Sequence, residues 1–220
     1  MKIIKLIIAV SVFSLSSLTY SQNIKITCDV SWSAKVKGIT VGKTEDKLTI
    51  RDNTILEINS VFTPGSALKI FGIKSIKRKA IFNGDGKIII REEETVGNKV
   101  AWKKSDKENY QKFKDNDLVE EISIDINKKI IDSTIFPYLA FFNLLNKEES
   151  LSVFILGKSS LYQAIIKRQD KIGKDTLFFE SDKSKGQVIL DADKKPSYFT
   201  FSQDGNTLEA SRTNWICSNN

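Results

Sequence analysis

Strict alternation of apolar and polar residues runs through most of the chain and predicts β-strands. The clearest example is 24–36, where seven apolar residues alternate with lysine, threonine, serine and aspartate. Successive strand side chains point to opposite faces, so this segment has one buried and one solvent-facing side. Short turns between strands favour antiparallel pairing, and this regular spacing favours a sandwich, roll or barrel. Further strands are predicted at 39–50, 54–62, 73–82, 87–95, 100–103, 122–126, 151–156, 161–168, 176–180, 187–190, 198–202 and 207–212.

Two segments between these strands lack the alternation. Residues 66–72 follow Thr63-Pro64-Gly65 and are predicted to form a short helical or irregular piece. Residues 105–117 are rich in lysine, aspartate and asparagine, and are predicted to form an exposed loop that Tyr110 and Phe113 attach to the body.

A long apolar run at 134–146 predicts the only convincing helix. Asp132 or Ser133 can cap it, and Pro137 is tolerated only in its first turn. The run leaves almost no polar stripe, so the helix must be covered on most sides. It is either a fixed core filler or a movable lid over an apolar cavity. The side chains that would form the lid or contact an apolar ligand are Phe136, Tyr138, Leu139, Phe141, Phe142 and Leu145.

Together these elements predict an all-β domain over residues 22–220. We expect a mainly antiparallel open barrel or roll, with the apolar helix packed on its concave face. No repeat, linker or low-complexity tract divides this part of the chain.

The first residues have the pattern of a signal peptide. A basic start with Lys2 and Lys5 precedes an apolar core, and small residues follow near Ser21. We therefore predict cleavage after Ser21, which makes 1–21 the signal peptide, and secretion across the inner membrane. Cys28 lies within a predicted strand, so no lipid-anchor motif is indicated.

Cys28 and Cys217 are the only cysteines. In an oxidising compartment, two cysteines near the ends of the mature chain suggest one disulfide. If the first and last strands are neighbours, such a bond would join them. Two buried free thiols are the alternative.

The chain carries a formal net charge of +7, which falls to +5 without Lys2 and Lys5. Its densest basic cluster either meets an anionic surface, such as lipid head groups, or is a solvated strand face. Nucleic-acid binding is not expected, because no recognised module or interleaved aromatic platform is present. The cluster consists of Lys69, Lys74, Lys77, Arg78 and Lys79.

Candidate catalytic chemistry is sparse. The absence of histidine removes Ser-His-Asp and Cys-His arrangements and most zinc sites. Residues 38–44 and 66–69 match a phosphate loop and a Ser-x-x-Lys motif only by chance, because the structural context and partner motifs are missing. Glu92 to Glu94 alternate on a strand, so their carboxylates do not converge. We predict no enzyme activity, no cofactor and no metal site.

The order of several motifs resembles the exported bacterial family of domain of unknown function 3108. The motifs are 38–42, 65–72 with the following lysine-rich strand, Asp132 before the apolar run, 186–191, and Pro196 with an alternating last strand. The resemblance covers about 26–212 and implies a periplasmic location, but no catalytic residue. In layout, a curved sheet around an apolar helix is also loosely similar to Lol-type lipoprotein carriers.

We therefore predict an exported, periplasmic, monomeric protein without enzyme activity that binds an apolar or amphiphilic ligand, such as a lipid or acyl chain. The alternative is an envelope structural or interaction protein with a filled core and no ligand. The expected partners are lipid, a lipoprotein or an envelope protein, with peripheral membrane contact. A cavity of several hundred Å³ would separate the two hypotheses.

Overall fold

The computed structural model describes residues 25–51, 55–96, 98–105, 109–123, 129–156, 161–182, 184–203 and 205–219. The predicted signal peptide at 1–21 lies outside these ranges. The described elements are β1 (Lys25–Val36), β2 (Ile39–Arg51), β3 (Ile55–Pro64), α1 (Ser66–Ile70), β4 (Ile76–Asn83), β5 (Ile88–Thr95), β6 (Asn98–Lys104), β7 (Asn109–Lys114), β8 (Asp117–Ser123), β9 (Ile130–Asp132), η1 (Phe136–Tyr138), β10 (Ser150–Leu156), β11 (Leu161–Lys171), β12 (Lys174–Glu180), β13 (Ser184–Leu190), β14 (Pro196–Gln203) and β15 (Asn206–Asn219).

The strands of the described ranges form one sheet of fifteen, built from two meanders. In β1–β8 and in β10–β15, each strand pairs antiparallel with its neighbour in the chain. The first and last strands, β1 and β15, pair with each other and so join the two meanders, as a disulfide between Cys28 and Cys217 requires. The short strand β9 pairs with β10 in parallel and ends the sheet opposite β8.

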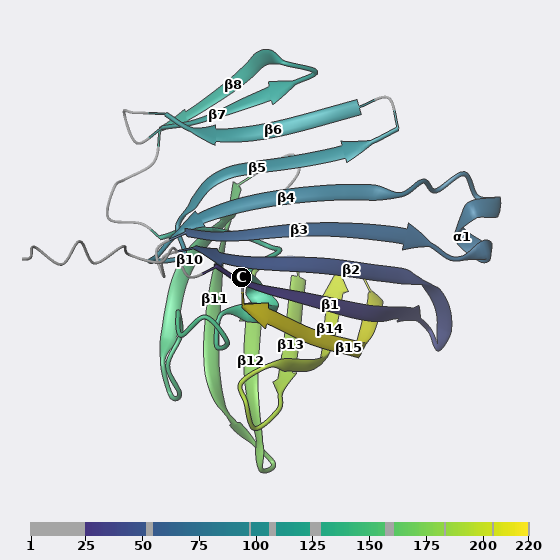
Figure 1. Cartoon of the computed structure of the whole chain (residues 1–220), viewed down its shortest axis with the longest axis vertical. Helices are drawn as coiled ribbons and strands as arrows, with labels where there is room; N and C mark the ends of the chain where they lie inside the picture. The colour runs from purple at the N-terminus through teal and green to yellow at the C-terminus, as the bar shows by residue number, and fades with distance from the viewer. Residues whose placement is uncertain are drawn as a thin grey trace, which may run out of the picture.

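The sheet is strongly curled but does not close. In Figure 1 the strands β2–β6 run across the view, while β11–β14 run nearly perpendicular to them. The curl brings β9 into contact with β5, and β6–β8 extend beyond this seam. The predicted all-β, antiparallel, open architecture is therefore confirmed.

The core lies on the concave face of this sheet. In β1, the even-numbered residues Cys28, Val30 and Trp32 are buried, and the same alternation continues in the neighbouring strands. Residues 133–147, which we call the plug segment, pack into this core between β9 and β10. Its Ile135, like Leu139 and Leu145, is fully buried, so the curved sheet encloses the apolar run much as the pattern indicated.

The predicted helix at 134–146 is wrong as an element. The plug segment contains one turn of 3-10 helix, Phe136–Tyr138, followed by successive turns. Pro137 sits in the first turn, as its missing N–H requires. Asn143 takes the left-handed conformation at φ 55°, which interrupts regular helix geometry.

Gly86 shows how closely the plug segment meets the sheet. It ends the hairpin turn between β4 and β5 at φ +74°, a conformation that favours glycine. A Cβ at this position would lie 2.7 Å from Cδ1 of Leu144 in the plug segment. Both the turn and the packing therefore require glycine here.

The predicted exposed loop at 105–117 is also wrong. Most of it belongs to the hairpin β7–β8, in which Asp115 and Asn116 form the turn with φ angles of 50° and 79°. Tyr110 is buried, and its hydroxyl donates a hydrogen bond to the carbonyl oxygen of Ile88. The short helical piece predicted at 66–72 is observed as α1. Of the strand predicted at 122–126, β8 includes residues up to Ser123 and the rest lies outside the described residues.

Candidate functional site

The concave face contains a cavity of about 500 Å³. Residues of β1–β4, α1, β14, β15 and the start of the plug segment line it. Most of its wall is apolar and includes Trp32, Phe62, Phe199 and Leu208. The polar residues of the wall are Thr44, Asp46, Ser60, Arg78, Ser133 and Thr134.

The strand alternation that builds the core also builds this wall. Every second residue of β1–β4 faces the concave side, which brings Asp46, Ser60 and Arg78 next to the apolar positions. Ala34 of β1 and Ala210 of β15 are directly opposite each other in the ladder, and both line the cavity. Two small side chains at this pair leave space that larger residues would fill.

Asp46 is the centre of a polar cluster between the sheet and the plug segment. The indole N–H of Trp32 lies 3.1 Å from Oδ2 of Asp46 and 3.1 Å from the hydroxyl of Tyr138. The Tyr138 hydroxyl also donates a hydrogen bond to Oδ2 of Asp46. Burial raises the pKa of Asp46 above its ordinary value of 3.8, although Ser60, Tyr138, Trp32 and Arg78 oppose this shift. Burial likewise raises the pKa of Tyr138 well above 10.0, so its hydroxyl stays protonated.

We expect Asp46→Asn to stabilise the protein increasingly as the pH rises. Because the folded-state pKa of Asp46 is raised, the native protein binds its proton more tightly than the unfolded chain does. Asp46 therefore contributes its full stabilisation below pH 3.8, the ordinary pKa that it has in the unfolded chain. This contribution is lost as the pH rises through the folded-state pKa. Asparagine keeps an acceptor oxygen for Tyr138 and does not titrate. Urea unfolding of both proteins at several pH values measures the difference; a difference that shrinks with rising pH would contradict the expectation.

One end of the plug segment is attached through a buried ion pair. Nε of Arg91 on β5 lies 2.6 Å from Oδ2 of Asp132, and the two side chains are 3% and 0% exposed. Asp132 also accepts a hydrogen bond from the backbone N–H of Thr134, 2.8 Å away, and so starts the turn. Glu93 bridges Arg91 to Arg78, at 3.0 and 2.9 Å. This network connects the cavity wall to the seam between β5 and β9.

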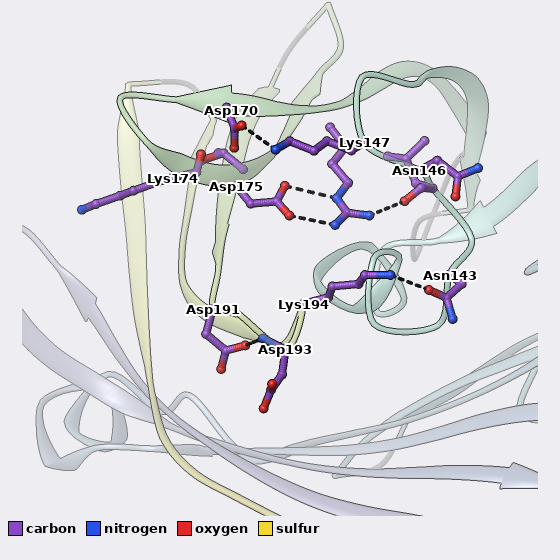
Figure 2. A network of polar contacts seen from close by, with 12 residues as sticks. Asn143, Asn146, Lys147, Asp170, Lys174, Asp175, Asp191, Asp193 and Lys194 are labelled. Atoms are coloured by element: carbon purple, nitrogen blue, oxygen red, sulfur yellow. Dashed lines mark hydrogen bonds and ion pairs between the residues drawn. The ribbon is translucent and has the colours of Figure 1, made fainter.

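The other end is attached by Arg168 of β11. Its Nη1 donates to the carbonyl oxygen of Leu145 at 2.9 Å, while Nε and Nη2 form a two-pronged pair with Asp175. Figure 2 shows this fork together with the contact between Lys194 and Asn143, 3.0 Å long, from the turn before β14. The described contacts thus hold the plug segment at both ends and, through Tyr138, near its middle.

The six side chains predicted to contact a ligand or form a lid lie in the core beside the cavity, and none of them is among its lining residues. Phe136 packs against Phe179, and Phe141 makes an edge-to-face contact with Trp215. Tyr138, Leu139 and Leu145 are buried, and Phe142 is partly buried. These contacts favour the fixed plug over the movable lid. Ser133, Thr134 and Pro137 are the part of the plug segment that reaches the cavity.

The predicted basic cluster is divided between two faces. Arg78 lines the cavity, whereas Lys77 and Lys79 point to the convex side of β4. Across the ladder from 77–79 lie the three glutamates 92–94 of β5, which offset much of this positive charge. Lys69 and Lys74 lie apart from them, on α1 and in the segment before β4, and both are exposed.

Asp46, Thr44 and Ser60 were missed as site residues. They occupy core-facing positions of strands whose other inward residues are apolar. An aspartate that replaces an apolar residue in this alternation is costly to bury, so Asp46 could have been recognised as a candidate site residue from the sequence. Arg91 and Arg168 are buried arginines of the same kind.

No family model matches the chain, and no curated protein matches it. Membership in the family of domain of unknown function 3108 is therefore not confirmed. Among solved structures, the chain is similar to a beta-barrel-like protein of domain of unknown function DUF1849 from Brucella abortus, with a TM-score of 0.51 and 10% identity over 89% of this chain and 98% of that one. A DUF1329 family protein from Desulfovibrio piger matches with a TM-score of 0.21 and 9% identity over 89% and 86%. The first similarity concerns the fold alone.

Proposed function

We propose that this protein binds an apolar or amphiphilic molecule, such as a lipid or acyl chain, in the cavity beside the plug segment. The observation that carries the proposal is an apolar space of about 500 Å³ on the concave face. This volume lies within the range of small-molecule pockets, about 300–1,000 Å³. A core that only needed to be filled would place larger side chains at positions such as Ala34 and Ala210.

The polar part of the wall supports an amphiphile with an anionic or hydrogen-bonding head group. Arg78 lines the cavity and donates from Nε to Glu93 at 2.9 Å, and its guanidinium carries further N–H donors with which it would bind a ligand. Ser60 and Thr134 add hydroxyl groups, while Phe62, Phe199 and Leu208 offer an apolar surface to a chain.

We expect Leu208→Trp to lower the affinity for a fluorescent fatty acid by about tenfold or more, because indole would fill space that the ligand needs. Leu208 is only partly buried and lines the cavity, so the substitution does not overpack the closed core. Leu118→Trp is the matched control, since Leu118 is 54% exposed on β8 and outside the cavity lining. Fluorescence titration measures both variants, and equal affinities for the two would contradict the cavity as the binding site.

Native mass spectrometry of protein purified from its own envelope distinguishes this proposal from the alternative function. A lipid that co-purifies with the wild type but not with the Leu208→Trp variant supports ligand binding in the cavity. A mass without ligand, together with no binding of the fatty-acid probe, would overturn it and favour an envelope structural or interaction protein.

The proposal includes export to the periplasm, without catalysis. The 1–21 signal pattern supports this location, and a disulfide between Cys28 and Cys217 suits an oxidising compartment. The order of motifs supports kinship with the exported family of domain of unknown function 3108. Cell fractionation, with and without residues 1–21, tests the location directly.

A further inference from the structure

One end of the sheet carries apolar side chains that the described protein does not cover. Ile70 and Phe71, at the end of α1, are 83% and 80% exposed. Ile39, which begins β2, is 63% exposed, and Ile73 is 41% exposed. We call Ile39, Ile70, Phe71 and Ile73 the apolar tip. α1 contacts β2, and in Figure 1 it protrudes at the end of the sheet where β1 turns into β2.

The two chain segments that carry the apolar tip contain charges of one sign only. The segments 36–43 and 65–75 contain four lysines, Lys37, Lys43, Lys69 and Lys74, and no aspartate or glutamate. Lys69 and Lys74 directly flank the exposed residues 70–73, and both are exposed. Exposed apolar side chains bordered by lysines suit the boundary of an anionic bilayer, where the apolar groups enter the interface and the ammonium groups meet the head groups.

The size of the apolar tip favours a bilayer over a protein partner. A stable protein interface covers about 800 Å² on each side, formed by roughly 20–30 residues. Here only four apolar side chains protrude: three lie in or just after the five-residue helix α1, and the fourth begins β2. Insertion into a lipid interface needs no complementary surface of that extent. Within the described ranges, no helix is long and apolar enough to cross a bilayer, so contact through this tip would be peripheral.

From these observations we propose that the apolar tip docks the protein on the surface of an anionic phospholipid membrane. The inference goes beyond ligand binding, but the two surfaces adjoin. Leu68 of α1 and Val41 of β2 line the cavity, while Ile70 and Phe71 of the same region point outward. Docking through the apolar tip would therefore bring the cavity close to the lipid from which an amphiphile could enter.

Co-sedimentation with vesicles tests the docking surface. We expect the wild type to bind vesicles of equimolar phosphatidylglycerol and phosphatidylethanolamine, and to bind phosphatidylcholine vesicles far less. Phe71→Glu should lower binding by about tenfold or more, because it removes a large inserted side chain and adds repulsion. Lys69→Gln and Lys74→Gln should each lower binding by about fivefold and weaken its salt dependence. All three positions are exposed, so an unchanged thermal melt is expected and verifies folding.

Ile172→Glu is the matched control. Ile172 is 93% exposed in the turn between β11 and β12, and it too lies near lysines, Lys171 and Lys174. In Figure 1 the turn between β11 and β12 lies at the bottom of the view, well away from α1, so this variant should bind vesicles like the wild type. An equal loss in both variants, or no binding by the wild type, would overturn the proposal. Dimers of the wild type that Phe71→Glu converts to monomers would instead assign the apolar tip to a second copy.

Different variants test ligand binding in the cavity and membrane docking through the apolar tip. Leu208→Trp should lose the fatty-acid probe and still bind vesicles, whereas Phe71→Glu should lose vesicles and still bind the probe. Loss of both properties in either variant, with a normal melt, would contradict the separation of docking surface and cavity.

Discussion

Asp132→Ala is expected to lower the free energy of unfolding by about 3–5 kcal/mol, because Arg91 and Arg78 would then share the single carboxylate of Glu93, which leaves one positive charge at the buried Arg91 uncompensated. Asp132 is 0% and Arg91 3% exposed, so water cannot replace the lost carboxylate. Among the described residues, Nη1 of Arg91 finds no hydrogen-bond partner even with Asp132 in place. The substitution also removes the acceptor of the Thr134 N–H that starts the plug segment. Urea unfolding followed by circular dichroism measures the loss.

The exposed pair of Lys147 and Asp170 provides the control for Asp132→Ala. Its side chains are 51% and 50% exposed, so Asp170→Ala should change the free energy of unfolding very little. Comparable losses for the two variants would contradict a special role of the buried pair.

A double variant separates the uncompensated charge from the lost hydrogen bonds. In Arg91→Met with Asp132→Asn, the remaining Arg78 and Glu93 still neutralise each other at 2.9 Å, and asparagine still accepts from Thr134. We expect this double variant to be clearly more stable than Asp132→Ala alone. A double variant as unstable as the sum of its single changes would assign the loss to packing.

The strands were predictable because a sheet with one buried face imposes alternation on the sequence. Hairpin turns, such as the one at 83–86, were a second signal because they mark where one strand ends and the next begins. The β7–β8 hairpin was missed because the lysines and asparagines around it suggest a loop. Yet the turn pair Asp115-Asn116 is typical of a tight hairpin and was a usable signal.

The helix at 134–146 was a wrong inference from a right observation. The apolar run correctly predicted burial, but it has no period because the segment is surrounded on all sides. Its conformation depends on partners far away in the chain, namely Arg168, which holds the Leu145 carbonyl, and Asp46, which binds Tyr138. Such tertiary contacts override local helix propensity.

The candidate site was only partly within reach of the sequence. Asp46 could be suspected because it interrupts a core-facing row. The link between Arg91 and Asp132 spans 41 residues, and it exists because the sheet curls until β9 meets β5. Curvature of this kind arises from the twist of many strands together, and no single segment encodes it.

Reduction of the disulfide between Cys28 and Cys217 is expected to lower the melting temperature by about 10–20 °C. The two cysteines are direct partners in the ladder between β1 and β15, and the structure joins them in a disulfide. The bond closes a loop with a sequence separation of 189, which corresponds to about 5 kcal/mol in the chain-entropy model, an upper figure. For a chain of this size, each kcal/mol shifts the melting temperature by about 2–4 °C.

The position of the bond explains why its loss should act on the whole fold. β1 and β15 join the two meanders, and the cysteine pair lies near the end of their ladder, two pairs before Ile26 and Asn219. Without the bond, the end of β15 should fray, so amides at 214–219 should exchange faster while those at 207–210 change less.

The double variant Cys28→Ala with Cys217→Ala should behave like the reduced wild type. Thiol titration of denatured, unreduced protein should find no free thiol; two free thiols would contradict the bond, and an unchanged melt after reduction would show that it constrains little.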